Sequence, residues 1–260
     1  MALGVNKQLG TTAQLHQVEN NGTNDDITLT DLLADRVLFT NLDGGNAGDE
    51  NIIGFGKNDS ILSFKKIFDG NNDGIINFGA NGILDIDRTS SKNAGSDQIT
   101  ISAAAKDGLR YLGNKTLFAD PVFDGVHVYA HASVRLAGFQ EGTVGDDLFN
   151  ALVGNNTYFY DTALGLNLGG DRITGFASGD RIVTTTKIYN GSADGPWISF
   201  GSNGVLDLPG EVDGVAGDQG VDNGGQIEFI GGPSLLALID ESSVGGVNYY
   251  YYGVVGDVVV

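Results

Sequence analysis

The sequence contains no cysteine, one methionine, one tryptophan and four prolines among its 260 residues. Without cysteine, the chain has neither a disulfide nor a thiolate metal site. Basic residues are also scarce, because 14 Lys and Arg stand against 33 Asp and Glu, for a formal net charge of −19. Nucleic acids and anionic membranes repel a surface of this sign, so we expect neither as a partner. The charge favours cations instead.

Long apolar runs are missing as well. No run approaches the roughly 18 residues that a membrane-spanning helix needs, so we expect no membrane insertion. The first twenty residues lack the apolar segment of about 7–15 residues that marks a cleaved secretory signal peptide.

Glycine, aspartate and asparagine are abundant. The chain has 41 Gly, 27 Asp and 22 Asn but only 6 Glu. Asp and Asn favour turns and caps over helix interiors, and Gly supplies the backbone conformations of tight turns. Since 41% of the residues are hydrophobic, the chain can still bury a core. Short β-branched or aromatic segments separated by Gly, Asn and Asp predict a mostly β fold. Only three short segments are predicted to be helical: Thr30–Asp35, Ala103–Leu112 and Pro233–Asp240.

The chain contains an internal duplication. Residues 48–74 match residues 169–195 at 11 positions after a shift of 121, and FGANGILD at 78–85 matches FGSNGVLD at 200–207. The same shift aligns GVHVY at 125–129 with GVNYY at 246–250, and the acidic pair at 25–26 with the pair at 146–147. We therefore predict an N-terminal arm (1–18) and two homologous β-rich units (19–139 and 140–260), each sandwich- or roll-like. A period of this length indicates two domains or half-domains, not a solenoid of short repeats.

One segment of the first unit, DGNNDGIIN at 69–77, has the spacing of a calcium-binding loop. Hard oxygen donors recur at alternate positions, and Gly74 allows the sharp turn. The predicted ligands are the side chains of Asp69, Asn71, Asp73 and Asn77 and the carbonyl of Ile75. The alternative is an Asn/Gly-rich hairpin turn without an ion.

The last ligand position of that loop holds Ala80, which has no side-chain oxygen. We expect Asp85 or Asp87, from the next strand, to replace the missing acid. In the second unit the matching loop has Asn190, Ser192 and Asp194, so only Asp194 is a carboxylate. Because the number of charged ligands sets calcium affinity, this loop should bind weakly or not at all.

The segment 142–183 resembles the RTX, or haemolysin-type calcium-binding, proteins. Their pattern is matched by Gly142, Thr143, Gly145, Asp146, Asp147, Asp161, Thr162, Asp171, Ile173, Phe176, Gly179, Asp180 and Ile182. The first unit matches more loosely through Gly22, Thr23, Asp25, Asp26, Ile52, Phe55, Asp59 and Ile61. The tandem Gly-Gly-x-Gly-x-Asp nonapeptides of the family are absent, so the resemblance does not carry over its calcium ligands.

The resemblance also implies a route out of the cell. Proteins of this family typically leave Gram-negative bacteria through type I secretion machinery, guided by an uncleaved C-terminal signal. Such signals often end in an acidic residue followed by apolar ones, as in Asp257-Val258-Val259-Val260. We therefore expect a secreted, extracellular protein. The alternative is that these residues form an ordinary last β-strand.

Two further groups of side chains are candidate binding residues. His127 and His131 are four residues apart, so on a strand they share one face and could ligate zinc. No third ligand is near them in the sequence, and the alternative is a pair of ordinary surface or core histidines. The tyrosine run 249–252 suits stacking on sugar rings. Sequence motifs of metalloproteases, serine hydrolases, P-loop proteins and dinucleotide-binding proteins are all absent.

Together these features predict a secreted, non-catalytic calcium-binding protein. We expect it to act at the cell surface or in the extracellular matrix, as a calcium-dependent adhesin or polysaccharide-binding module. Two alternatives stay open: a structural protein of a surface layer or biofilm, and an extracellular hydrolase whose carboxylates the sequence does not single out.

Overall fold

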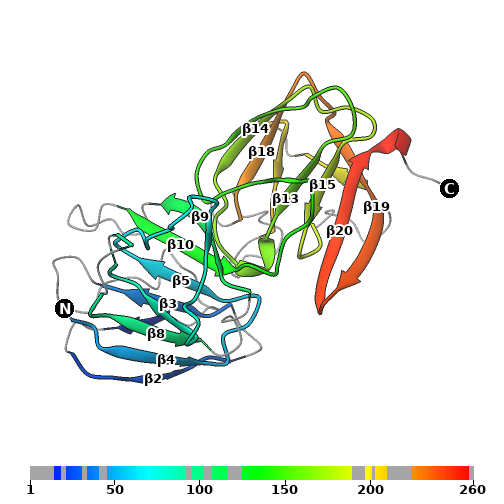
Figure 1. Ribbon diagram of the computed structural model, residues 1–260. Coiled ribbons are helices and arrows are strands. Elements are labelled where there is room, and N and C mark those ends of the chain that lie inside the picture. Colours follow the sequence, from blue (N-terminus) through cyan, green and yellow to red (C-terminus); the bar gives the residue numbers. More distant parts are fainter. Residues whose placement is uncertain are drawn as a thin grey trace. The chain divides into compact units, whose positions relative to one another are not determined.

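The computed structural model contains two compact units, residues 1–134 and 135–260 (Figure 1). The predicted boundary lies a few residues later in the chain. No helix in the described part of the chain is long and apolar enough to cross a membrane. The structure describes residues 15–18, 22–30, 34–40, 46–88, 90–91, 95–101, 107–115, 125–188, 197–200, 203–209 and 224–257.

The described residues of each unit form ten strands. The first unit contains β1 (Leu15–Val18), β2 (Asp26–Thr28), β3 (Arg36–Phe39), β4 (Asp49–Ile53), β5 (Ser60–Ser63), β6 (Ile75–Ile76), β7 (Ile83–Asp85), β8 (Gln98–Ile101), β9 (Leu109–Lys115) and β10 (Val126–His131). The second contains β11 (Gln140–Glu141), β12 (Leu148–Asn150), β13 (Thr157–Tyr160), β14 (Gly170–Thr174), β15 (Arg181–Thr184), β16 (Trp197–Ser199), β17 (Val205–Asp207), β18 (Gln226–Ile230), β19 (Leu235–Val244) and β20 (Val247–Val254).

The two units have the same topology. In the first, a six-stranded sheet has the order β1-β3-β5-β10-β9-β6 and a four-stranded sheet the order β2-β4-β8-β7. In the second, the orders are β11-β13-β15-β20-β19-β16 and β12-β14-β18-β17. Every strand of one unit thus has its counterpart ten places later in the other. The predicted mostly β fold with two matching units is confirmed. Residues 15–18, which the sequence analysis placed in an N-terminal arm, form β1 and pair with β3.

Within each unit the chain alternates between the two sheets. It passes from β1 through β2, β3 and β4 to β5, and strands of one sheet that follow each other along this path pair in parallel. The pairs Arg36↔Ser60, Leu148↔Arg172 and Thr157↔Arg181 each join residues 24 positions apart. This is a roll, in which one coil of about 24 residues stacks on the next. The duplication gives two units, as predicted, and a shorter coil period lies inside each of them.

Glycine permits the close stacking of coils at one corner of each roll. Gly48 and Gly169 are duplicated counterparts with φ of 100° and 89°. A Cβ on Gly48 would collide with the carbonyl oxygen of Thr23, and one on Gly169 with that of Gly145. Both the backbone conformation and the approach of the neighbouring coil therefore require glycine.

The core of the first unit lies between its two sheets. One continuous apolar cluster contains Val37, Phe39 and Ile61 of the six-stranded sheet and Ile52 and Ile99 of the four-stranded sheet, all at most 1% exposed. The strands β3 and β5 are buried along their whole length. Central parallel strands are typically enclosed on both faces in this way, and they read as continuous apolar runs.

The predicted helices are wrong wherever the structure describes them. Leu235–Val244 forms β19, which pairs with β16 and β20, and Leu109–Lys115 forms β9. Short apolar runs such as Leu235–Ile239 fit a buried strand as well as a helix, so only the pairing partner decides. Thr30, Ala34 and Asp35 have no regular structure. The remaining residues of the predicted helices at 31–33 and 103–106 lie outside the described residues. The helical segments described are two 3₁₀ turns, η1 (Thr162–Leu164) and η2 (Val255–Asp257).

A buried tyrosine makes the same contact in both units. The hydroxyl of Tyr129 accepts a hydrogen bond from the Ile67 N–H (2.7 Å), and that of Tyr252 accepts one from the Ile188 N–H (2.8 Å). Strand pairing gives the same equivalence, because Tyr129 lies opposite Ile61 and Tyr252 opposite Ile182. The alignment of GVHVY with GVNYY is therefore wrong by two residues, and Tyr252 is the counterpart of Tyr129.

We expect Tyr129→Phe and Tyr252→Phe each to destabilise their own unit by about 1–3 kcal/mol, because each change leaves a buried amide N–H unpaired. Tyr250→Phe is the matched control, since the Tyr250 side chain is partly exposed, and a loss under about 0.5 kcal/mol is expected. Urea unfolding monitored by tyrosine fluorescence measures all three. Equal losses in the three variants would contradict the assigned equivalence.

Candidate functional site

The predicted calcium loop forms a tight turn that leads into β6. Asp69 organises it: its Oδ2 accepts the Gly74 N–H (2.8 Å), and its Oδ1 accepts the N–H groups of Asn71 (3.2 Å) and Asn72 (3.0 Å). Asn72 has a positive φ of 56°, and Gly74 has one of 80°. Asp69, the first residue of the loop, thus fixes the backbone at Gly74, the sixth residue, as a turn wrapped around an ion requires.

Asp73 supplies the second carboxylate of the same turn. Its Oδ1 accepts the Ile75 N–H, and its Oδ2 accepts the Asn71 side-chain amide, both at 2.8 Å. Asn71, Asp73 and Asn77 are exposed. Each oxygen of the Asp73 carboxylate accepts one hydrogen bond and has a second lone pair for a metal. The residues of the loop therefore fit a hard cation, with two carboxylates and amide and carbonyl oxygens as donors.

The two acids expected to complete the loop, Asp85 and Asp87, lie beyond β6, in and directly after β7. Asp85 lies in β7, on the opposite sheet, and Asp87 accepts hydrogen bonds from Ser96 (3.0 Å) and from the Asp97 N–H (3.2 Å). Within the described ranges, no three His, Asp or Glu side chains are placed together to hold a metal ion. Asp85 and Asp87 follow the loop closely in the sequence, but β6 belongs to the six-stranded sheet and β7 to the four-stranded sheet. The second loop, with Asn190, Ser192 and Asp194, lies outside the described residues.

Buried carboxylates that the sequence analysis did not single out as ligands connect successive coils. Asp59 Oδ1 accepts the Asp35 N–H (2.9 Å), and its Oδ2 accepts the Gly56 N–H (2.6 Å). Its duplicated counterpart Asp180 accepts the N–H groups of Asn156 (2.8 Å) and Ala177 (2.9 Å) in the same way. Asp59 and Asp180 are each 2% exposed. These acids therefore close the corners of the roll.

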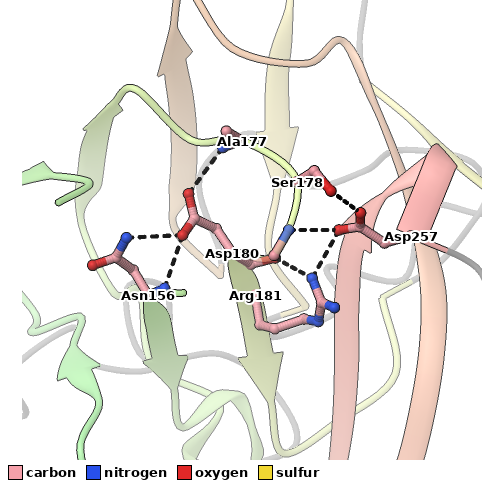
Figure 2. A network of polar contacts seen from close by, with 7 residues as sticks. Asn156, Ala177, Ser178, Asp180, Arg181 and Asp257 are labelled. Carbon is pink, nitrogen blue, oxygen red and sulfur yellow. Dashed lines mark hydrogen bonds and ion pairs between the residues drawn. The ribbon is translucent and has the colours of Figure 1, made fainter. Parts of the chain in front are cut away.

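Asp257 extends this network to the C-terminal segment of the second unit. Figure 2 shows its carboxylate facing the turn between β14 and β15, where it accepts hydrogen bonds from the Ser178 hydroxyl and the Gly179 N–H (3.0 Å) and pairs with Arg181 (2.8 Å). Burial by itself raises the pKa of Asp257, but these partners together hold that pKa below its ordinary value. The first residue of the predicted export signal is thus fixed onto the folded unit.

A second type of buried acid occurs at equivalent positions in β4 and β14. Glu50 Oε2 accepts the Asp25 N–H, and Asp171 Oδ1 accepts the Asp147 N–H, both at 2.8 Å. The structure therefore matches Asp25 with Asp147, one residue away from the alignment made on sequence. The other oxygen of each acid, Glu50 Oε1 and Asp171 Oδ2, is enclosed without a hydrogen-bond partner among the described residues.

Burial shifts the protonation of these acids. It raises the pKa of Asp171 to about 7, helped by the charges of Asp147 and Asp146. The Tyr160 hydroxyl is the neighbouring polar group, although it completes no hydrogen bond of normal geometry with Asp171. Burial likewise raises the pKa of Glu50, with the charges of Asp25 and Asp49 adding to it, and burial together with Asp87 raises that of Asp97.

The histidine pair has separate partners. His127 Nδ1 contacts the Tyr111 hydroxyl, and His131 Nδ1 contacts the Ser133 hydroxyl, both at 2.8 Å. Burial and the charge of Lys66 lower the pKa of His127. No third zinc ligand stands beside the two histidines in the described ranges.

The tyrosine run divides between the core and the surface. Tyr249 packs against Phe159, and Tyr252 is buried, whereas Tyr250 and Tyr251 are partly exposed. Only these last two tyrosines are available to stack on a ligand.

No family model, curated protein or solved structure matches the chain. The resemblance to RTX proteins therefore stays a prediction that rests on the matched residues.

We expect Asp171 to make the second unit less stable as the pH rises. Its folded-state pKa of about 7 lies above the ordinary value of 3.8. Asp171 therefore makes its full contribution to the free energy of unfolding below about pH 4 and loses it as the pH rises through 7. The upper limit of this contribution is roughly 4 kcal/mol. Measured by thermal unfolding, the stability of the wild type relative to Asp171→Asn should fall between pH 4 and 7. An exposed control, Asp26→Asn, should leave the wild-type pH profile unchanged. Parallel profiles for wild type and Asp171→Asn would show that Asp171 is ionised throughout.

Proposed function

We propose that this chain is a non-catalytic calcium-binding protein that is exported and acts at the cell surface or in the extracellular matrix, where it binds polysaccharide. The observation that carries the proposal is the loop at 69–77. Its first acid, Asp69, accepts the Gly74 N–H, and two carboxylates of one turn lie beside exposed amide oxygens. This is donor chemistry for a hard cation and not for a soft metal.

The charge of the chain gives calcium a second role. At a net charge of −19, the carboxylates repel one another in the compact state. Asp59 and Asp171, for example, lie between coils, and each accepts the N–H of another acidic residue 24 positions earlier in the chain. A cation that binds only the folded chain stabilises it in proportion to the logarithm of its concentration. Abundant external calcium would therefore favour folding after export, and low internal calcium would leave the chain less stable.

Exposed aromatic side chains support the polysaccharide part of the proposal. Trp197 of β16 is 53% exposed, and Tyr250 and Tyr251 of β20 are partly exposed in the same six-stranded sheet. Flat aromatic faces with a polar edge pack well on sugar rings. Lys187 lies over the Tyr250 ring (5.8 Å) and pairs with Glu241 (2.7 Å), so charged groups lie beside Tyr250.

We expect Asp73→Asn to reduce both the calcium-induced rise in Tm and calcium-dependent retention on polysaccharide-coated beads. The substitution removes one charge from the loop and keeps an oxygen for the Ile75 N–H. Each tenfold loss of calcium affinity lowers the stabilisation at saturating calcium by about 1.4 kcal/mol. Differential scanning calorimetry with calcium and with EGTA measures the shift.

Asp240→Asn is the matched control for this experiment. Asp240 is also exposed and also accepts a neighbouring backbone N–H, from Glu241 (2.9 Å), but it lies in β19. Equal calcium responses in the two variants would contradict the assignment of the loop. Retention that survives EGTA would contradict a calcium-dependent adhesin, and release of soluble sugar from the beads would favour the hydrolase alternative.

We expect deletion of residues 257–260 to keep the protein inside cells that have an intact type I exporter, because the deletion removes the acidic residue and the apolar end of the signal. Arg181→Gln is the control, since it breaks the folded contact with Asp257 and leaves the C-terminal sequence unchanged. Immunoblots of culture medium and cell pellet measure the distribution. Normal secretion of the truncated chain, or retention of Arg181→Gln as strong as that of the truncation, would overturn this assignment.

A further inference from the structure

Two buried acids lie at the same end of the neighbouring central strands β4 and β8 in the four-stranded sheet of the first unit. Glu50 lies in β4 and is 2% exposed, and Asp97 directly precedes β8 and is 0% exposed. One oxygen of each is occupied, because Glu50 Oε2 accepts the Asp25 N–H (2.8 Å) and Asp97 Oδ1 accepts the Ala47 N–H (2.9 Å). These two bonds fix the side chains in place.

The second oxygen of each acid is enclosed and has no partner. Glu50 Oε1 and Asp97 Oδ2 are fully buried atoms without a hydrogen bond to any described residue. A buried carboxylate oxygen left in this state costs free energy, and two neighbouring carboxylates also repel each other. A cation bound by both oxygens would remove both costs.

The second unit shows that the fold does not require this pair. Asp171 is the counterpart of Glu50, because both lie in the second position of matching strands and accept the N–H of matching residues. The counterpart of Asp97 is Gly225, since Gln98 pairs with Asp49 as Gln226 pairs with Gly170. The second carboxylate is therefore a feature of the first unit alone.

We propose that Glu50 and Asp97 bind one hard divalent cation, of which calcium is the representative, through their unpartnered oxygens. This inference rests on the proposed calcium dependence of the protein and adds a site separate from the loop at 69–77. In the part of the chain that the structure describes, no third acid side chain completes a cage here. The exposed side-chain oxygens of Asn24 and Asn46, which accept the N–H groups of Asp49 and Gly48, and water molecules would supply the remaining ligands. Calcium accepts such mixed oxygen sets of irregular geometry.

The test uses the full chain with the loop disabled by Asp69→Asn and Asp73→Asn together. Isothermal titration with calcium should show that this variant retains one bound ion. Adding Glu50→Gln and Asp97→Asn should remove that ion, while adding Asp171→Asn should not. The amide replacements still accept the Asp25 and Ala47 N–H groups, and circular dichroism checks that each variant folds. Asp97→Gly, which copies the second unit, is the second variant if the double replacement is unstable.

The outcomes separate this inference from the proposed function. If the loop-disabled chain binds no calcium, or if the ion survives the loss of Glu50 and Asp97, the inference is overturned and the loop assignment stands by itself. If the loop substitutions change nothing and the Glu50 and Asp97 substitutions remove one ion, the loop assignment fails and the inference holds.

Discussion

The structure depends on side-chain carboxylates that accept the backbone N–H of the neighbouring coil. Asp59 binds the amide of Asp35, and Asp180 binds that of Asn156, in each case across 24 residues. Coil corners lack the regular pairing of strands, so their amides need other acceptors when they are buried. Short acidic side chains reach these amides from the next coil and fix its register. The same requirement explains the composition, in which Asp far exceeds Glu and glycine permits the closest approaches of the backbone.

This way of joining coils has an electrostatic cost. Each acid that closes a corner is removed from water, and several lie near other acids, which raises the pKa of Glu50, Asp97 and Asp171. The chain offers few basic residues to offset these charges. Protons and metal cations are the remaining sources of positive charge. A roll assembled from carboxylates is therefore sensitive to pH, and it is suited to a medium rich in divalent cations.

The duplication has preserved the frame of the roll and changed its polar side chains. Tyr129 and Tyr252 make the same hydrogen bond, and Asp59 and Asp180 close the same corner. By contrast, Asn156 replaces Asp35 and Gly225 replaces Asp97. The second unit thus has fewer acids at these buried positions, and its C-terminal segment is held by Asp257 instead. The exposed aromatic side chains Trp197, Tyr250 and Tyr251 belong to the second unit.

The sequence by itself determined the fold class, the duplication and the turn at 69–77, because composition and local spacing are properties of neighbouring residues. It did not determine which strands pair. The run Leu235–Ile239 became a strand because β16 and β20 flank it, and Asp85 came to lie in β7, in a different sheet from β6. The sequence does contain the 24-residue spacing that separates Asp147 from Asp171 and Asn156 from Asp180. Successive coils share few identical residues, however, so this repeat is hard to recognise from the sequence. Only the stacking of coils decided which acids are buried, since burial depends on residues far apart in the chain.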